Sequence, residues 1–158
     1  MSTALLTPAA AVVAEARAWL GTRWQHQAAL KGVACDCAGL VLGVARALGL
    51  AVPQSVPPYD RRPDGVMLRE LCEAHLRPLP HAVSLVTGEL VPSPGQVLLF
   101  RFDAAPQHLG IVGDGPGYLT LIHAHAPDRR VVEHRLDDTW RARLVAAYAL
   151  PGVAPWPV

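Results

Sequence analysis

Two cysteines on either side of an aspartate, Cys35-Asp36-Cys37, form the stretch of the sequence best suited to chemistry. An apolar run with helical spacing follows them, formed by Leu40, Val41, Val44 and Leu48. Asp36 fits the N-cap of that helix, so Cys37 falls in the first turn. Unpaired backbone N–H groups and the helix dipole favour a thiolate there, and we therefore expect a nucleophilic cysteine with a lowered pKa. A small buried cysteine in a helix core is the alternative.

A nucleophilic cysteine needs a general base nearby, and the second half of the chain offers histidines in segments typical of strands. A hairpin centred between Gly115 and Pro116 would place His108 directly opposite His123, on one face of the sheet. A one-residue change in this register would turn one histidine to the other face. If the cysteine helix packs on the histidine face, Cys37, His108 and His123 converge on one site.

The elements that must position these residues come in the order helices first and strands second. We expect helices over 8–20, 37–48 and about 65–76, with Thr7, Asp36 and Asp64 as their N-caps. A loop is expected over 22–34 and a proline-rich connector over 53–63. Strands are predicted over 96–102, 108–112, 118–125, 129–136 and 143–150. The order predicts an α+β fold, with N-terminal helices packed on a C-terminal antiparallel sheet of about five strands.

The composition fits one globular domain over residues 1–158, because 51% of the residues are hydrophobic and 17% are charged. We expect a core over about 8–151, an excursion of connector and helix over 53–80, and a tail over 152–158. A net charge of +1 gives no electrostatic reason to expect a nucleic-acid partner. No apolar run reaches the roughly 20 residues that span a bilayer. Glu15 and Arg17 interrupt the first apolar stretch, so we expect no signal peptide, synthesis in the cytoplasm and free thiols.

Five motifs, in this order, resemble those of the NlpC-type cysteine peptidases, papain-like enzymes that cut the peptides of bacterial cell walls. They are Trp19-Leu20-Gly21-Thr22, Asp36-Cys37-Ala38-Gly39-Leu40, Pro94-Gly95-Gln96-Val97-Leu98-Leu99-Phe100, His108-Leu109-Gly110-Ile111-Val112 and Ile122-His123-Ala124. The resemblance covers nearly the whole chain, from about Ala14 to Pro151. The Cys-Asp-Cys form, with His26-Gln27 and Lys31-Gly32 upstream, is similar to a branch of that family found in phage tails and gene-transfer agents.

The resemblance implies a papain-like fold and a thiol protease that hydrolyses peptidoglycan stem peptides, at the γ-D-glutamyl bond to a diamino acid. It implies that Cys37 is the nucleophile, with Cys35 as a bystander, and that the backbone N–H of Cys37 is an oxyanion donor. His108 would be the general base and His123 the group that orients it, with His125 as the alternative third member. The histidine in the following strand, His134, is expected to be structural or exposed.

Other residues near the cysteine are candidates for the oxyanion site or for substrate binding, namely Asp36, Trp24, His26, Gln27 and His125. Trp24 stands where many members of the family have a tyrosine, and an indole offers only an N–H donor. Ala38 replaces the usual serine of the family's cysteine box. Both departures bear on whether the chain is active.

Three alternatives remain at this point. A zinc site using Cys35, Cys37 and the strand histidines is one, although Cys-x-Cys is a poor match to the spacing of structural zinc sites. The second is an inactive structural protein of a tail assembly with the same fold. Acyl transfer to an acceptor other than water is the third. We expect no cofactor and no resident metal, peptidoglycan stems as substrate, and phage-like tail proteins as partners in a phage-like particle.

Overall fold

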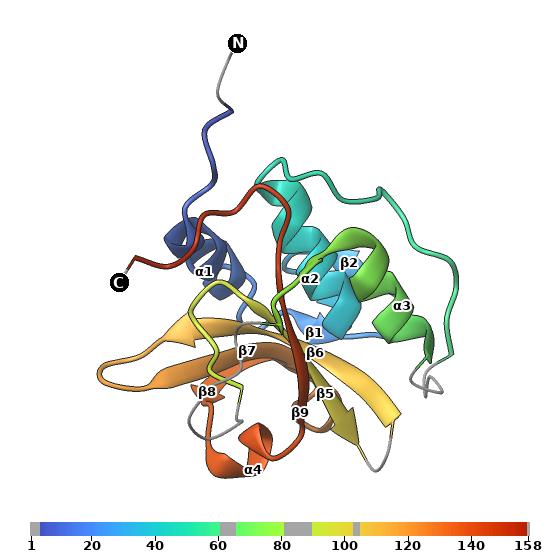
Figure 1. The fold of residues 1–158 in the computed structure, drawn as a ribbon. Coiled ribbons are helices and arrows are strands. Elements are labelled where there is room, and N and C mark those ends of the chain that lie inside the picture. The colour runs from blue at the N-terminus through green and yellow to red at the C-terminus, as the bar shows by residue number, and fades with distance from the viewer. Residues whose placement is uncertain (1–3, 61–65, 81–89, 103–104, 158) are drawn as a thin grey trace.

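Three helices cover one side of a curled sheet, and a short fourth helix lies against the other side (Figure 1). The computed structural model describes residues 4–60, 66–80, 90–102 and 105–157. The helices are α1 (Ala9–Arg17), α2 (Cys37–Ala47), α3 (Val66–His75) and α4 (Asp138–Arg141). The expected N-cap of the third helix, Asp64, lies outside the described residues. Of the described helices, every one is too short or too polar to cross a membrane.

The described part of the sheet has nine strands in the order β2-β3-β1-β8-β7-β6-β5-β9-β4. The five expected strands are present as β5 (Val97–Phe102), β6 (Ala105–Asp114), β7 (Leu119–His125), β8 (Arg130–Arg135) and β9 (Leu144–Ala149). The other four have two residues each: β1 (Arg23–Trp24), β2 (Ala29–Leu30), β3 (Ala34–Cys35) and β4 (Arg77–Pro78). The expected number of about five strands was therefore wrong.

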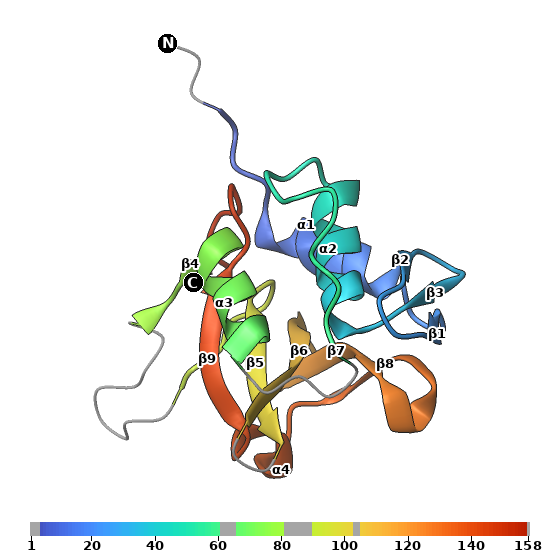
Figure 2. The same cartoon turned by 90° about the vertical axis from the view of Figure 1, so that its right-hand side faces the viewer.

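Two of the additional strands, β1 and β2, lie in the segment 22–34, which we expected to be a loop, and β3 begins at its last residue. Strands of two residues are too short to show an alternating pattern in the sequence. β1 pairs in parallel with β3 and antiparallel with β8, so the sheet is mixed rather than purely antiparallel. These strands lie beside the beginning of α2 (Figure 2) and bring the segment around His26 to the cysteine. β9 also departs from a simple meander, because it returns to pair with β5.

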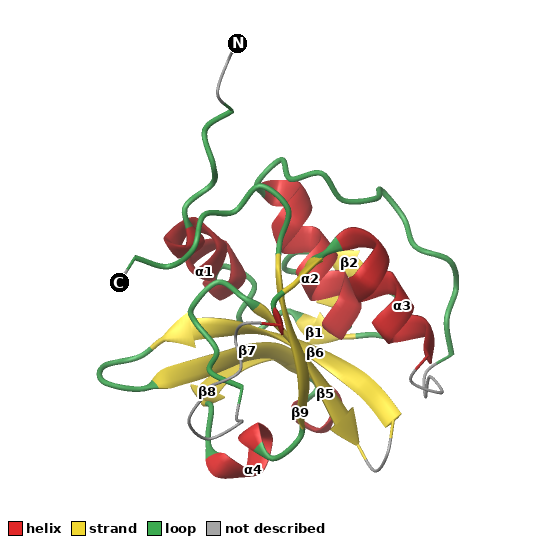
Figure 3. Ribbon diagram, viewed as in Figure 1, coloured by secondary structure: helices red, strands yellow, loops and turns green. Residues whose placement is uncertain are grey.

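Side chains on the two faces of the sheet belong to two different clusters, as strand alternation requires. The face toward α1, α2 and α3 presents Leu99, Leu109, Ile111, Ile122 and Ala124. The opposite face, toward α4, presents Leu98, Phe100, Val112 and Leu121 with Trp140. Figure 3 shows the three long helices together on one side of the strands and α4 on the other. The sheet is thus covered on both faces, whereas we expected helices on one.

The start of α2 agrees with the sequence. Asp36 is the N-cap, and its Oδ1 accepts a hydrogen bond of 2.8 Å from the backbone N–H of Gly39. A Cβ atom at Gly39 would lie 1.9 Å from the carbonyl oxygen of Ala28, so only glycine lets the segment 25–28 pack this closely against the helix. Gly49, with φ +69°, follows the last turn as expected.

The two ends of the chain differ slightly from expectation. α1 begins one residue later than predicted, with Pro8 rather than Thr7 at the N-cap, and Leu20 is 43% exposed. Thr7 instead pairs with the C-terminal segment: its N–H donates to the oxygen of Gly152, and its own oxygen accepts from Ala154, both at 2.8 Å. Part of the segment expected to be a tail is therefore attached to the N-terminal segment.

Candidate active site

A cavity of about 560 Å³ brings together residues that are distant in the sequence. Cys37 lines it from the first turn of α2 and His108 from β6. The connector and α3 supply further lining, including Tyr59, Asp60, Met67, Leu68 and Leu71. Of the other candidates from the sequence, Asp36, Trp24, His26 and His125 also line the cavity. Gln27 contacts a residue of the site through its backbone, because its N–H donates a hydrogen bond of 2.7 Å to Asp36 Oδ2.

The cavity lies at the end of β7 rather than over one face of the sheet. Ala124 and His125 are neighbours whose side chains point to opposite faces, and both line it. α2 packs on the face that carries Leu109 and Ala124, whereas His108 stands opposite Phe100 on the other face. The condition under which we expected Cys37 and the histidines to converge, that the cysteine helix packs on the histidine face, is therefore not met. Cys37 and His108 share the cavity because each reaches it from a different face at the end of the sheet.

Burial determines the protonation state of the cysteine. It raises the pKa of the Cys37 thiol to about 12, and the negative charge of Asp36 acts in the same direction. Hydrogen bonding from the backbone N–H groups of Leu109, Ala38 and Cys37 itself lowers the pKa by a smaller amount. The expected lowered pKa was thus wrong for the free protein: the desolvation of a thiolate outweighs the contribution of the helix N-terminus.

The register of the β6–β7 hairpin differs by two residues from the expected one. Ile111 pairs with Ile122 and Asp114 with Leu119, so Gly110 rather than His108 stands opposite His123. A shift of two residues keeps both histidines on the same face. Gly110 leaves room for the rings of His108 and His123 to meet diagonally across the two strands, because a Cβ atom at Gly110 would lie 3.3 Å from the Cβ of His123.

Three histidine rings form a hydrogen-bonded chain on the face toward α4. His108 Nε2 lies 2.7 Å from His123 Nδ1, and His123 Nε2 lies 2.7 Å from His134 Nε2. The chain ends where His134 Nδ1 lies 2.8 Å from the carbonyl oxygen of Arg135. The ring of Trp140 packs against all three, with its centroid 4.9 Å from that of His123. His134, which we expected to be structural or exposed, is therefore connected to His108 through one intervening ring.

Burial also keeps the inner histidines neutral. It lowers the pKa of His108 to about 3, and charge on His125 and His134 acts in the same direction. The pKa of His123, which is fully buried, is lowered for the same reason and by its histidine neighbours. His125 is arranged differently, because its Nδ1 is paired with Asp128 Oδ2 at 2.8 Å. The hydrogen-bonding partner of His108 is thus His123.

The connector is attached to the N-cap of α2 by a residue that sequence reasoning missed. The Tyr59 hydroxyl donates a hydrogen bond to Asp36 Oδ2, and burial followed by the charge of Asp36 raises the pKa of this hydroxyl. His26 Nε2 donates to the Tyr59 carbonyl oxygen at 2.8 Å, and the two rings meet edge to face. A signal was present, since Tyr59 is the single aromatic residue in the proline-rich segment 53–63.

The zinc alternative finds no support in the geometry. Cys35 is fully buried in the cluster between the helices and the sheet, away from the face that carries the histidine chain. Cys72 is buried in the same cluster, and His75 is exposed. Across the described ranges, no group of three histidine, cysteine, aspartate or glutamate side chains is arranged to hold a metal ion.

Comparisons with known proteins identify the fold. No family model and no curated protein matches the sequence. A Staphylococcus aureus protein described as similar to a lipoprotein of the NLP/P60 family superposes with a TM-score of 0.59 at 17% identity, covering 96% of this chain and 45% of its own. The NlpC/p60 domain of the peptidoglycan hydrolase SagA gives a TM-score of 0.55 at 19% identity, covering 90% of this chain and 98% of its own.

A third structure, NlpC1 from Trichomonas vaginalis, gives a TM-score of 0.56 at 16% identity over 89% of this chain and 42% of its own. The chain therefore has the papain-like NlpC/P60 fold, as the sequence resemblance implied. It spans less than half of the length of the Staphylococcus aureus protein that it resembles.

Proposed function

We propose that this chain is a cysteine peptidase that hydrolyses amide bonds in the peptide stems of peptidoglycan. The observation that carries the proposal is that Cys37 and His108 line one cavity while His108 is hydrogen-bonded to the buried His123. A nucleophile, a base and a group that orients the base are the parts that thiol catalysis needs. The SagA domain with this fold is described as a peptidoglycan hydrolase, which supports the choice of substrate.

The proposed reaction starts from a neutral thiol and a neutral imidazole. Cys37 Sγ attacks the carbonyl carbon of the scissile amide while its proton passes to His108 Nδ1, the ring nitrogen that is not bound to His123. The resulting oxyanion lies near the N-terminus of α2, where the backbone N–H of Cys37 is in the first turn and points away from the carbonyl groups of the helix. The C–N bond then breaks, His108 returns the proton to the leaving amine, and a thioester remains.

Hydrolysis of the thioester uses the same groups. His108 removes a proton from a water molecule, the water oxygen attacks the thioester carbonyl, and the C–S bond breaks. The proton then returns to Cys37 Sγ and restores the starting state. The γ-D-glutamyl bond to a diamino acid, which the sequence resemblance implies, is the bond that we propose is cut.

Mass spectrometry of stem-containing muropeptides tests this proposal. The wild type should cut the stems, and Cys37→Ala should leave them intact. Cys35→Ala is the matched control, and it should retain activity because this cysteine is buried in the core. Intact stems with the wild type would reject the proposal in favour of an inactive structural protein. Transfer of the acyl group to an added amine, without hydrolysis, would favour the acyltransferase alternative.

We further propose that the protein acts within a phage-like particle, beside tail proteins. The Cys35-Asp36-Cys37 form of the cysteine box, which is similar to that of phage-tail and gene-transfer-agent peptidases, supports this. Co-purification with intact particles through a density gradient is the expected result. Recovery only from the particle-free fraction would reject this placement and leave the proposed chemistry unaffected.

A further inference from the structure

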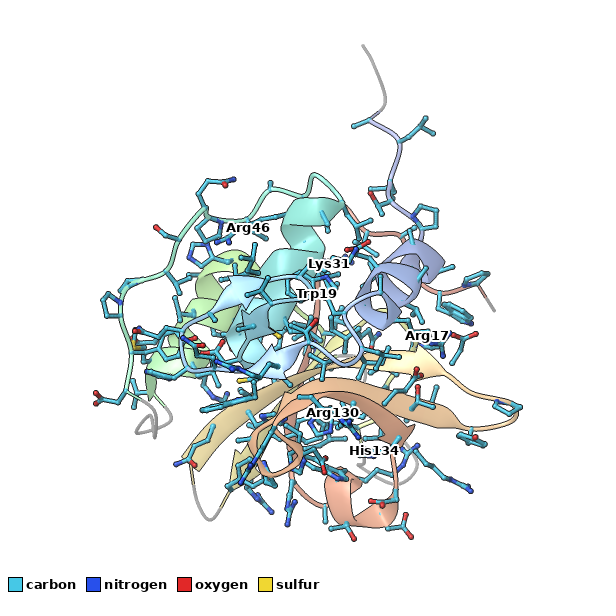
Figure 4. All side chains as sticks on the ribbon, turned by 180° about the vertical axis from the view of Figure 1, so that it is seen from behind. Arg17, Trp19, Lys31, Arg46, Arg130 and His134 are labelled. Carbon is cyan, nitrogen blue, oxygen red and sulfur yellow. The ribbon has the colours of Figure 1, made fainter. Side chains whose placement is uncertain are left out.

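The histidine chain continues beyond the two rings that the proposed chemistry uses. His134 lies on β8, two residues along from the position opposite His123, because β7 pairs Leu121 with His134 and His123 with Val132. It is partly exposed, on the side of the sheet away from α1, α2 and α3 (Figure 4). Its two ring nitrogens are both used, one by His123 and one by the Arg135 carbonyl oxygen.

We propose that His134 is a positioning residue that, through His123, holds the proton of His108 on Nε2 and leaves Nδ1 free to accept the proton of Cys37. This inference rests on the proposed function for its catalytic meaning. Its structural basis is independent of that function, because the direction of the hydrogen bonds follows from the chain of rings alone.

The direction is set at the outer end of the chain. A carbonyl oxygen only accepts, so Nδ1 of His134 carries the proton that bonds to Arg135. A neutral imidazole has one N–H, and Nε2 of His134 is therefore an acceptor. His123 must then donate from Nε2, which leaves its Nδ1 as an acceptor. His108 consequently donates from Nε2 to His123, and its own Nδ1 holds an unshared electron pair.

Without His134, two arrangements of the inner pair become available. His108 can donate from Nε2 to His123 Nδ1, or His123 can donate from Nδ1 to His108 Nε2. The second arrangement puts the proton of His108 on Nδ1, where it cannot accept the thiol proton. His134 selects the first arrangement from a distance, without reaching the cavity itself.

Protonation of His134 reverses the same chain. Both of its nitrogens then donate, so His123 accepts at Nε2 and donates from Nδ1, and His108 carries its proton on Nδ1. Among the described residues, the titratable groups along this hydrogen-bonded chain are His123 on β7, in direct contact with His134, and His108 on β6 beyond it. From α4 it meets the Trp140 ring, which does not titrate. A proton added to His134 would thus move the proton of His108 to Nδ1, through a residue outside the cavity.

Nitrogen-15 NMR of labelled histidines tests the assignment directly, because protonated and unprotonated ring nitrogens have different shifts. At neutral pH the wild type should show Nε2–H on His108 and His123 and Nδ1–H on His134. In His134→Leu, His108 should populate both tautomers. A proton on Nδ1 of His108 in the wild type would overturn the proposal, and so would an unchanged His108 tautomer in His134→Leu.

Alkylation of Cys37 by iodoacetamide gives a second reading that needs no peptidoglycan. His134→Leu should slow it about twofold at neutral pH, because roughly half of the molecules would then carry the His108 proton on Nδ1. His134→Gln, whose amide oxygen can accept from His123, should restore most of the rate. His75→Gln, at an exposed histidine on α3, is the matched control and should behave as the wild type.

The two readings separate this inference from the proposed function. If the tautomers and alkylation rates are as expected but the muropeptides stay uncut, the proposed function is rejected and the role of His134 is not. If the muropeptides are cut but the alkylation rate is unchanged in His134→Leu, the role of His134 is rejected and the proposed function is not. If His134→Leu does not fold, the wild-type spectrum and His134→Gln still decide the question.

Discussion

The hydroxyl of Tyr59 donates a hydrogen bond to the carboxylate of Asp36, the residue that caps the helix beginning with Cys37. Tyr59 belongs to the proline-rich connector, and Asp36 belongs to the cysteine box. Because Asp36 is 4% exposed, the contact also supplies a partner for a buried charge. The connector is therefore a wall of the candidate site, rather than a spacer between its two halves.

Tyr59→Phe should destabilise the protein by about 1–3 kcal/mol, because a buried carboxylate loses a donor while the packing of the ring is kept. The midpoint of urea denaturation measures this. Tyr118→Phe, on an exposed ring in the β6–β7 turn, is the matched control and should leave the midpoint nearly unchanged. Equal midpoints for the two variants would show that the Tyr59 contact contributes nothing to stability.

Asp36→Asn should lower the pKa of the Cys37 thiol, because the negative charge of Asp36 is one of the causes that raise it. Asparagine is also a good N-cap, so α2 keeps its start, whereas Asp36→Ala should cost about 1 kcal/mol of stability. The pH dependence of Cys37 alkylation is the measurement, and its rise should move to lower pH in Asp36→Asn. A rise at the wild-type pH would contradict the electrostatic role of Asp36.

Stability should fall in acid because of the buried histidines. Burial lowers the pKa of His108 from 6.5 to about 3 in the fold, so the unfolded chain binds a proton that the native state excludes. The free energy of unfolding is therefore highest above pH 6.5. It falls by about 1.4 kcal/mol per pH unit for one group as the pH falls toward 3. The pKa of His123 is lowered as well, and it adds to the slope.

Urea midpoints measured at intervals through this pH range check the prediction, with His108→Gln as the variant that should show a shallower slope. Midpoints that stay constant as the pH falls below 6.5 would show that the inner histidines are not held neutral by the fold.

Gly39→Ala should destabilise the protein by about 3 kcal/mol or more, because the new Cβ would lie 1.9 Å from a backbone oxygen of Ala28. The segment 25–28 must then move away from α2, and the hydrogen bond from Gln27 to Asp36 should be lost with it. Thermal unfolding and Cys37 alkylation measure the two effects. Gly39→Ala with wild-type stability would mean that the close approach relaxes at no cost.

The sequence by itself determined the local parts of the site. Asp36 at the N-cap, Cys37 in the first turn and the five long strands follow from propensities and spacings within a few residues. His108 and His123 share a face under either hairpin register, because the strand period is two and the registers differ by two residues. The N-cap and helix of the cysteine box, the shared face of the two histidines and the papain-like class of the fold were therefore predictable, whereas the nine strands and the mixed sheet were not.

The tertiary structure decided which elements meet. Which face of the sheet α2 covers and the contact of Tyr59 with Asp36 each depend on segments that are separated in the sequence. The protonation of Cys37 also belongs here, because desolvation depends on all the atoms around the thiol and outweighs the local effect of the helix N-terminus. The role of His134 depends on the register of the hairpin formed by β7 and β8, because its hydrogen bond to His123 exists only in the observed pairing.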